Sequence, residues 1–134
     1  MRPPRPVAVG DRAPARRIGP ITQTDIVRFA GAGGDFNPLH HDPSFAQAAG
    51  FRSVIAMGQM QAGILAAYLS DWLGVEHLRD YEVRFAAPVH LGDVLELSCE
   101  IVGIADGLAT IVLSASVGGE AVVTARACAV VGNG

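Results

Sequence analysis

The chain has 134 residues, a length typical of a single domain that buries a core of its own. Its ten basic residues, all arginine, are outnumbered by 13 acidic residues, and the net charge of −3 argues against non-specific nucleic-acid binding, which needs a basic surface. Half of the residues are hydrophobic and only 17% are charged. So few charges would leave much of a monomer's surface uncharged. We therefore expect another subunit to cover part of that surface.

No segment indicates export, since no apolar run follows the Arg/Pro-rich start. No uncharged apolar run is long enough to span a membrane. We therefore expect a cytoplasmic protein without membrane contact. Residues 1–8 are predicted to be a flexible N-terminal arm and residues 9–134 a single domain. Cys99 and Cys128 lie in apolar runs without metal-binding or redox spacing, which predicts free thiols.

The first half of the domain predicts a short strand followed by three helices. The strand covers residues 15–18, and Thr22 or Thr24 caps a first helix that ends at a run of glycines. Asp42 and Pro43 begin a second, short helix. The longest helix runs from Gly58 to about Leu73 and carries small residues on several faces, which predicts that it is buried.

The second half changes to a period of two. Apolar residues alternate with polar ones over residues 80–87, 95–101, 109–115 and 121–127, which predicts four strands. Turn sequences at Asp106-Gly107 and Gly118-Gly119 predict that the last three strands form an antiparallel meander. A sheet needs its apolar face covered, and the long helix is the only candidate. The sequence thus predicts an α+β fold with an antiparallel sheet wrapped around one helix.

The loop from Gly33 to Pro43 holds most of the chain's chemistry. Asp35 and His40 lie five residues apart, and Pro38 prevents a regular helix between them. A turn could therefore direct both side chains at one water, where a carboxylate and an imidazole act as a general acid–base pair. Asn37 lies between them, and its amide could fix their orientation.

Each of these residues alone would more often be structural, as a turn carboxylate, a turn signal or a surface histidine. Together, in a chain with only four histidines, they favour a functional site. A metal site is the rival interpretation, because His40, His41 and Asp42 are all ligand types. Adjacent histidines on an extended chain point to opposite sides, and no further ligand cluster exists. We therefore expect no metal.

The segment Gly34-Asp35-Phe36-Asn37-Pro38-Leu39-His40, with Asp42-Pro43, Phe45-Ala46 and Gly50-Phe51, resembles the hydratase-2 signature of the MaoC-like (R)-specific enoyl-CoA hydratase family. Further matches, to the catalytic subunit of mycobacterial (3R)-hydroxyacyl-ACP dehydratases, are Tyr68, Asp71-Trp72, Gly74, Tyr81 and Val83-Arg84-Phe85. The resemblance implies a hot-dog fold, in which an antiparallel sheet wraps a long central helix, and pairing into a dimer. The element order predicted from periodicity agrees with that fold.

The resemblance also implies roles for particular residues. Asp35 and His40 would be a catalytic dyad that holds and activates water, with Asn37 as support. Gly58 matches the glycine of the family's His-Gly-Met motif. In that motif the backbone N–H at the start of the central helix binds the thioester oxygen. That role suits the positive end of a helix dipole and a residue without a side chain.

The chain departs from the family's usual residues on either side of Gly58 and at Ala66. Met57 stands where the family usually has His, Gln59 where it usually has Met, and Ala66 where some members have Ser. Met57, Gln59 and Met60 are predicted to line an acyl pocket of altered shape, core packing being the alternative. Arg52 and Arg84 could bind ligand phosphates or simply be solvated.

The resulting hypothesis is a lyase that interconverts trans-2-enoyl and (3R)-3-hydroxyacyl thioesters. No cofactor is expected beyond the CoA or acyl-carrier phosphopantetheine that is part of the substrate. The expected assembly is a homodimer, with a heterodimer containing a second hot-dog subunit as the alternative. Two other functions stay open: a weakly active or non-catalytic acyl-thioester-binding subunit of a heteromeric dehydratase, and a hot-dog thioesterase.

Overall fold

A computed structural model describes residues 1–134. The strands and helices, in chain order, are β1 (Pro6–Val7), β2 (Arg16–Ile18), α1 (Gln23–Gly33), α2 (Pro43–Ala48), α3 (Gly58–Leu73), β3 (Leu78–Phe85), β4 (Leu95–Ala105), β5 (Leu108–Val117), β6 (Glu120–Val130) and β7 (Gly132–Asn133). Two single-turn 3₁₀ helices, η1 (Pro38–His40) and η2 (Val75–His77), precede α2 and β3 respectively.

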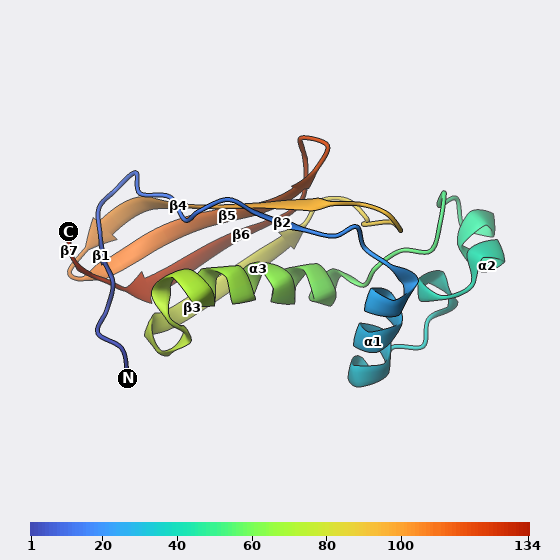
Figure 1. The fold of residues 1–134 in the computed structure, drawn as a ribbon, viewed down its shortest axis with the longest axis horizontal. Helices are drawn as coiled ribbons and strands as arrows, with labels where there is room; N and C mark the ends of the chain where they lie inside the picture. The colour runs from blue at the N-terminus through green and yellow to red at the C-terminus, as the bar shows by residue number, and fades with distance from the viewer.

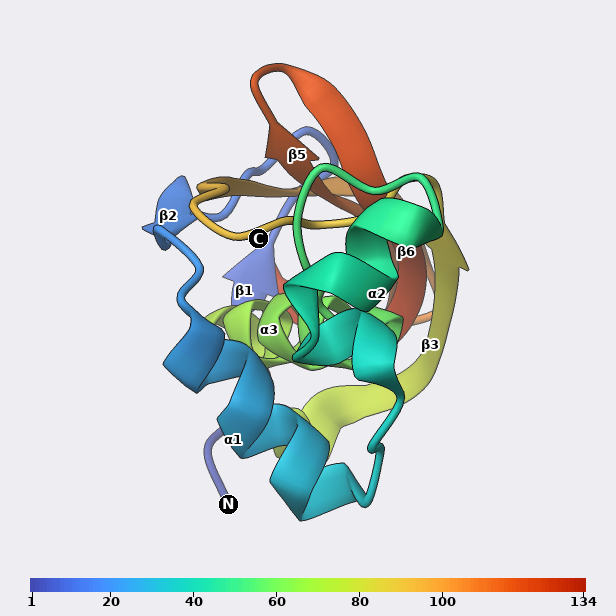
Figure 2. The same ribbon diagram turned by 90° about the vertical axis from the view of Figure 1, so that its right-hand side faces the viewer.

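Five strands form one antiparallel sheet in the order β2-β4-β5-β6-β3. β4, β5 and β6 are the predicted meander, and Asp106 and Gly107 turn the chain between β4 and β5 with positive φ angles of 54° and 75°. α3 runs along one face of the sheet, which curves over it from β2 to β3 (Figures 1 and 2). The predicted α+β fold, with the sheet wrapped around one long helix, is therefore confirmed.

The core lies between the sheet and α3. Alternate residues of β4, β5 and β6 are buried, among them Leu97, Ile111 and Ala125. Leu65 and Leu69 of α3 belong to the same core and are inaccessible to solvent. This alternation is what the period of two in the sequence predicts for a sheet with one face covered.

The prediction that α3 is buried holds for only one of its sides. Leu65, Tyr68 and Leu69 are buried, whereas Gly63 and Ala67 are exposed on the side turned away from the core. Of the small residues that suggested burial on several faces, Gly63 and Ala67 thus lie on an open side, whereas Ala62 is buried. The reason is that a single five-stranded sheet covers only part of a helix's circumference.

α1, η1 and α2 gather beyond the N-terminal end of α3, at one end of the sheet (Figures 1 and 2). Thr22, not Thr24, caps α1: its side chain accepts a hydrogen bond from the backbone of Asp25, whose carboxylate accepts one from Thr22. This reciprocal capping box also explains why the pKa of Asp25 is lowered, because both its backbone and side-chain hydrogen bonds with Thr22 favour the charged carboxylate.

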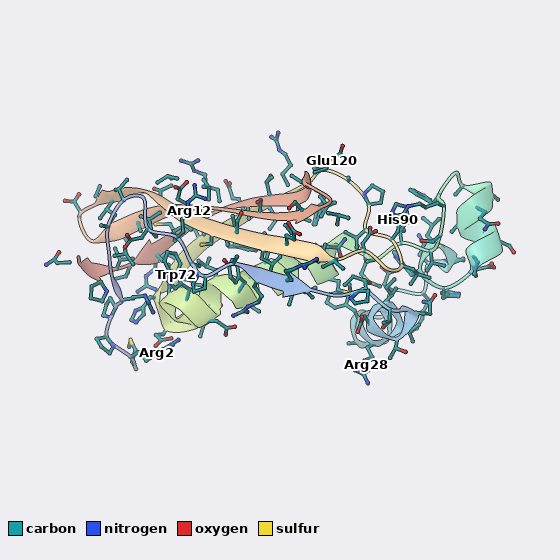
Figure 3. All side chains as sticks on the ribbon, turned by 45° about the horizontal axis from the view of Figure 1, so that its top comes forward. Arg2, Arg12, Arg28, Trp72, His90 and Glu120 are labelled. Atoms are coloured by element: carbon teal, nitrogen blue, oxygen red, sulfur yellow. The ribbon has the colours of Figure 1, made fainter.

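The start of the chain lies at the other end of the molecule, far from His90 (Figure 3). β1 pairs in parallel with β7, a two-stranded ladder that the sequence did not predict. Arg2 hydrogen-bonds Glu76 just beyond the C-terminal end of α3. The flexibility predicted for residues 1–8 stays a prediction, and motion of the arm would have to break these contacts. No helix in the structure combines the length and apolar character needed to cross a membrane.

Candidate active site

The loop that bears Asp35 begins with the end of α1. Gly34 caps that helix in the left-handed region, with φ of 68° and ψ of 25°, a conformation that glycine adopts without steric strain. The backbone N–H of the next residue, Asp35, donates to the carbonyl of Ala30 at 2.9 Å. Asp35 therefore leaves the helix in a fixed direction, and its side chain is 44% exposed.

Asn37 shapes the loop through the backbone. Its Oδ1 accepts a hydrogen bond from the N–H of Leu39 at 3.0 Å and so caps η1. Its own N–H donates to Asp35 Oδ1 at 3.2 Å. Asn37 thus orients Asp35 by a main-chain bond, whereas the side-chain amide that was expected to link the two reactive groups serves as a helix cap.

His40 is buried, with 7% of its surface exposed, and both ring nitrogens have defined neighbours. Nδ1 donates to the carbonyl of Ile55 at 2.7 Å, and Nε2 lies 3.2 Å from Asp35 Oδ2. Since a carbonyl can only accept, the Nδ1 proton is held in that bond, and Nε2 is the ring nitrogen that faces Asp35. A proton exchanged with Asp35 or with a ligand would therefore pass through Nε2.

The segment before α3 clamps this loop. The backbone N–H of Ile55 donates to the carbonyl of Leu39 at 3.0 Å, next to the bond that holds the His40 ring. From the other side, Gln23 Nε2 donates to the backbone carbonyl of His40 at 2.9 Å. Because Ile55 lies three residues before Gly58, these bonds fix the dyad relative to the start of α3.

One pocket, with a volume of about 590 Å³, contains the dyad and the start of α3. Its lining comes from three separate parts of the chain: Asp35, His40, Ile55, Ala56, Met57, Gly58, Gln59, Gln61, Phe85, Ala86, Ala87 and Pro88. The predicted residues Asp35, His40, Met57, Gly58 and Gln59 are thus brought together. Apart from the dyad and two glutamines the lining is mostly apolar, as suits an acyl group.

Gly58 lies at the first position of α3, where a backbone N–H has no partner within the helix. No side chain caps this end, and no protein group accepts a hydrogen bond from the Gly58 N–H. A Cβ at this position would lie 2.7 Å from Phe85 Cε1, so any residue other than glycine would force the ring or the start of α3 to move. The pocket that contains the dyad therefore also has an N–H donor without a protein partner.

Four predicted residues lie elsewhere in this chain. Met60 lines a second cavity, of about 580 Å³, between α1 and α3. Arg52 pairs with Asp93 at 2.9 Å, and Arg84 lies on the outer face of the sheet together with Arg12 and Arg126. The fourth residue is Asn37, whose side chain caps η1. None of these four residues lines the pocket of the dyad, and their predicted contacts with substrate stay predictions.

Seven pocket residues were not predicted for the site, and two of them bear on its chemistry. Phe85 was noted as part of a strand and of the family resemblance, and its ring packs against Gly58. Gln61 is 2% exposed, and its Oε1 is sealed from solvent without any hydrogen-bond partner. An unsatisfied buried polar group costs about 1–3 kcal/mol, so it needs an explanation. The available signal was a second glutamine, two residues after Gln59, in the first turns of a mostly apolar helix.

Comparison with known proteins identifies the class. Residues 5–123 match the family model described as the MaoC like domain, and the chain therefore belongs to that family. The (R)-specific enoyl-CoA hydratase of Rhodospirillum rubrum is 33% identical over 87 residues, which are 63% of this chain and 60% of that protein. The chain thus spans less than two thirds of that relative's length.

Solved structures agree over more of the chain. The (R)-hydratase from A. caviae involved in PHA biosynthesis is 26% identical, with a TM-score of 0.84 over 94% of this chain and 98% of that one. A chain of the ChsH1-ChsH2 complex from Mycobacterium tuberculosis is 26% identical, with a TM-score of 0.84 over 93% of this chain and 98% of that one. The hot-dog fold and the family resemblance inferred from the sequence are both confirmed.

Proposed function

We propose that this protein is a hydro-lyase that adds water reversibly to trans-2-enoyl thioesters and yields (3R)-3-hydroxyacyl thioesters. The observation that carries the proposal is one pocket lined both by the Asp35–His40 pair and by Gly58, whose N–H is unpartnered. The names of the relatives support the same reaction class, since one is an (R)-specific enoyl-CoA hydratase and another an (R)-hydratase.

In the hydration direction a water molecule binds beside the Asp35–His40 pair, within hydrogen-bonding reach of both groups. His40 takes a proton from the water at Nε2, the ring nitrogen that is not bonded to the Ile55 carbonyl. The water oxygen forms a bond to C3 as the C2–C3 π electrons move toward the thioester oxygen. The Gly58 N–H and the helix dipole stabilise that oxygen, and the dyad returns a proton to C2. Dehydration follows the same steps in reverse.

The substrate carrier is CoA or the phosphopantetheine of an acyl-carrier protein. No metal or redox cofactor takes part in the proposed reaction, because an N–H donor stabilises the developing charge and the dyad moves the proton. Met57 and Gln59, which depart from the family's usual residues, line the pocket beside Gly58 and would therefore influence which acyl groups are accepted.

Replacement of the dyad tests the proposal. Asp35→Asn and His40→Gln should each lower the rate of enoyl-CoA hydration by about 10²–10⁴-fold, the range of general acid–base contributions. The rate is read from the loss of the conjugated enoyl absorbance across a panel of acyl chains, and free thiol is measured in parallel to detect thioesterase activity. His41→Gln is the matched control, since His41 is an exposed histidine in the same loop.

Unfolding curves of each variant separate lost chemistry from lost structure. A wild type that hydrates enoyl-CoA, together with folded dyad variants of near-normal rate, would refute the roles of Asp35 and His40. Release of free thiol without hydration would instead favour the thioesterase.

A second candidate is a binding subunit of a heteromeric dehydratase. Gly63 and Ala67 on the open side of α3 are exposed, and β3 is an edge strand of the sheet, so a second hot-dog subunit could pack there. One structural neighbour is itself a chain of a two-component complex. Sedimentation of the purified protein distinguishes a homodimer from a monomer that needs another chain. Binding of acyl-CoA without turnover would support this candidate over the enzyme.

A further inference from the structure

Gln61 is the one polar side chain whose situation neither the fold nor the dyad explains. It belongs to α3, is 2% exposed and lines the pocket that contains Asp35, His40 and Gly58. Its Oε1 is sealed from solvent without a partner. No protein group ties down either end of the carboxamide, so the end that reaches the pocket is available to a ligand.

The helix geometry aims this side chain at the start of α3. Side chains of an α-helix tilt toward its N-terminus and cover the turn before their own Cα. Gln61 follows Gly58 by three residues, so its carboxamide covers the turn that bears the unpartnered Gly58 N–H. Both groups line the same pocket, so both can contact one ligand atom.

We propose that the Nε2 of Gln61 is a second hydrogen-bond donor to the thioester oxygen, alongside the backbone N–H of Gly58. This rests on the function proposed above. Since Oε1 is the sealed end of the carboxamide, the donor end is the one left to reach the pocket. A carbonyl oxygen has two lone pairs, and one backbone N–H satisfies only one of them.

Such a donor would act mainly on the transition state. As water adds to C3, negative charge develops on the thioester oxygen, and preorganised donors bind it more strongly than they bind the ground-state carbonyl. Gln61 is held in place by burial before the substrate arrives, so little reorganisation accompanies the reaction. It would be a catalytic residue, because it touches the oxygen on which the charge develops.

The kinetic test uses Gln61→Leu, which keeps a similar volume and removes the donor. The kcat for enoyl-CoA hydration should fall about 10²-fold, as expected for one oxyanion donor, while KM changes less than about threefold. Gln47→Leu is the control, since it removes an exposed amide of α2 outside the pocket. An unchanged kcat in Gln61→Leu would overturn the inference and leave the dyad untouched.

A binding test needs no turnover and so stands apart from the proposed reaction. Butyryl-CoA and S-butyl-CoA have the same chain, but only butyryl-CoA has the carbonyl oxygen. Gln61→Leu should weaken butyryl-CoA several-fold and leave S-butyl-CoA unchanged. In the Asp35→Asn background, the infrared carbonyl band of bound enoyl-CoA should shift less to low frequency when Gln61 is leucine.

Two other outcomes would contradict the inference, and a third would separate it from the proposed mechanism. Equal weakening of both ligands with a lower unfolding temperature would mean that Gln61 only supports the fold. Weakening confined to acyl groups with a polar substituent would mean that Gln61 contacts the acyl chain. Active dyad variants combined with a selective loss of butyryl-CoA binding would refute the proposed mechanism but keep Gln61 as a carbonyl donor.

Discussion

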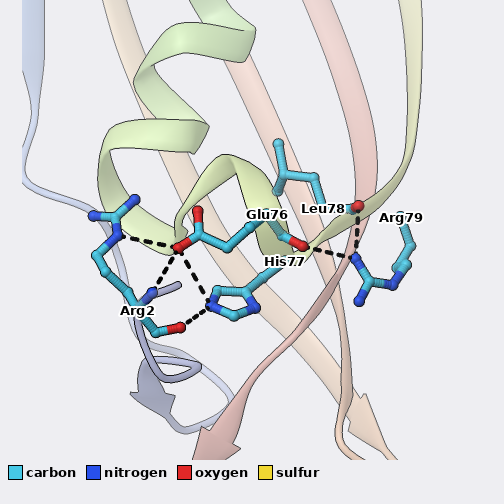
Figure 4. Close-up of polar contacts among 5 residues, drawn as sticks. All are labelled: Arg2, Glu76, His77, Leu78 and Arg79. Atoms are coloured by element: carbon cyan, nitrogen blue, oxygen red, sulfur yellow. Dashed lines mark hydrogen bonds and ion pairs between the residues drawn. The ribbon is translucent and has the colours of Figure 1, made fainter.

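The two ends of α3 differ in how completely their polar groups are paired. At the N-terminal end no side chain caps the helix, the N–H of Gly58 is unpartnered and Gln61 is buried without a hydrogen bond. At the C-terminal end the N–H of Gly74 donates to the carbonyl of Ser70 at 2.8 Å. Glu76 accepts from both the backbone and the side chain of Arg2 (Figure 4).

Each end also holds one buried histidine, and the two are used differently. His77 Nε2 donates to the carbonyl of Arg2 at 2.8 Å and so ties the start of the chain to η2 (Figure 4). In His40 only Nδ1 donates to a backbone carbonyl, and Nε2 lies against Asp35 in the pocket. Unpaired donors and acceptors thus concentrate at the end that has a pocket, which is the pattern expected when polar groups are kept for a ligand instead of for stability.

Gly58→Ala is the mutation with the largest expected effect, and it tests whether the N-terminal end of α3 is kept open for a ligand. The new Cβ would lie 2.7 Å from the Phe85 ring, so the ring or the start of α3 must shift. A displacement of about 1 Å in a positioned group can lower a rate by about 10²-fold, and that is the expected fall in hydration rate. The overpacking should also destabilise the fold by about 1–3 kcal/mol in urea unfolding.

Gly31→Ala is the matched control for Gly58→Ala, because it adds the same methyl group to an exposed helical glycine of α1 and meets no atom within 4 Å. Full activity in Gly58→Ala would show that the start of α3 does not need to be open. A rate loss of equal size in Gly31→Ala would show that the effect does not depend on Phe85.

At the C-terminal end of α3 we expect a mutation to lower stability and to leave activity unchanged. His77→Phe removes the donor to the carbonyl of Arg2 and leaves that carbonyl without its partner. The free energy of unfolding should fall by about 1–3 kcal/mol while the hydration rate per folded molecule stays the same. Thermal unfolding and the enoyl-CoA assay together check it. A variant that unfolds normally but loses activity would contradict the division between the two ends.

The mildest prediction concerns pH. Burial, and then the charge of Arg52, lower the pKa of His90, while Asp93 opposes them. Because the folded pKa lies below the unfolded value of about 6.5, the fold favours the neutral ring. This contribution to stability is present above pH 6.5 and is lost as the pH falls through the folded pKa. Urea unfolding at pH 7.5 and pH 5.5 should therefore show a smaller difference in His90→Gln than in the wild type, and an equal difference would contradict it.

Local patterns in the sequence determined the elements and the polar loop. The alternation over residues 95–101, 109–115 and 121–127 predicted β4, β5 and β6, because a strand with one covered face repeats every two residues. Glycines and prolines predicted where helices begin and end. Asp35 and His40 were close enough in sequence for a single turn to bring them together, and they lie 3.2 Å apart.

Tertiary structure alone decided the contacts between distant segments. A period of two does not specify a strand's neighbours, so the positions of β2 beside β4 and β3 beside β6 could not be predicted. The sequence likewise could not show that Arg84 lies on the outer face of the sheet and not in the pocket of the dyad. Gln61 was overlooked because its lack of a partner depends on every segment packed around it, and no spacing along the chain reports that.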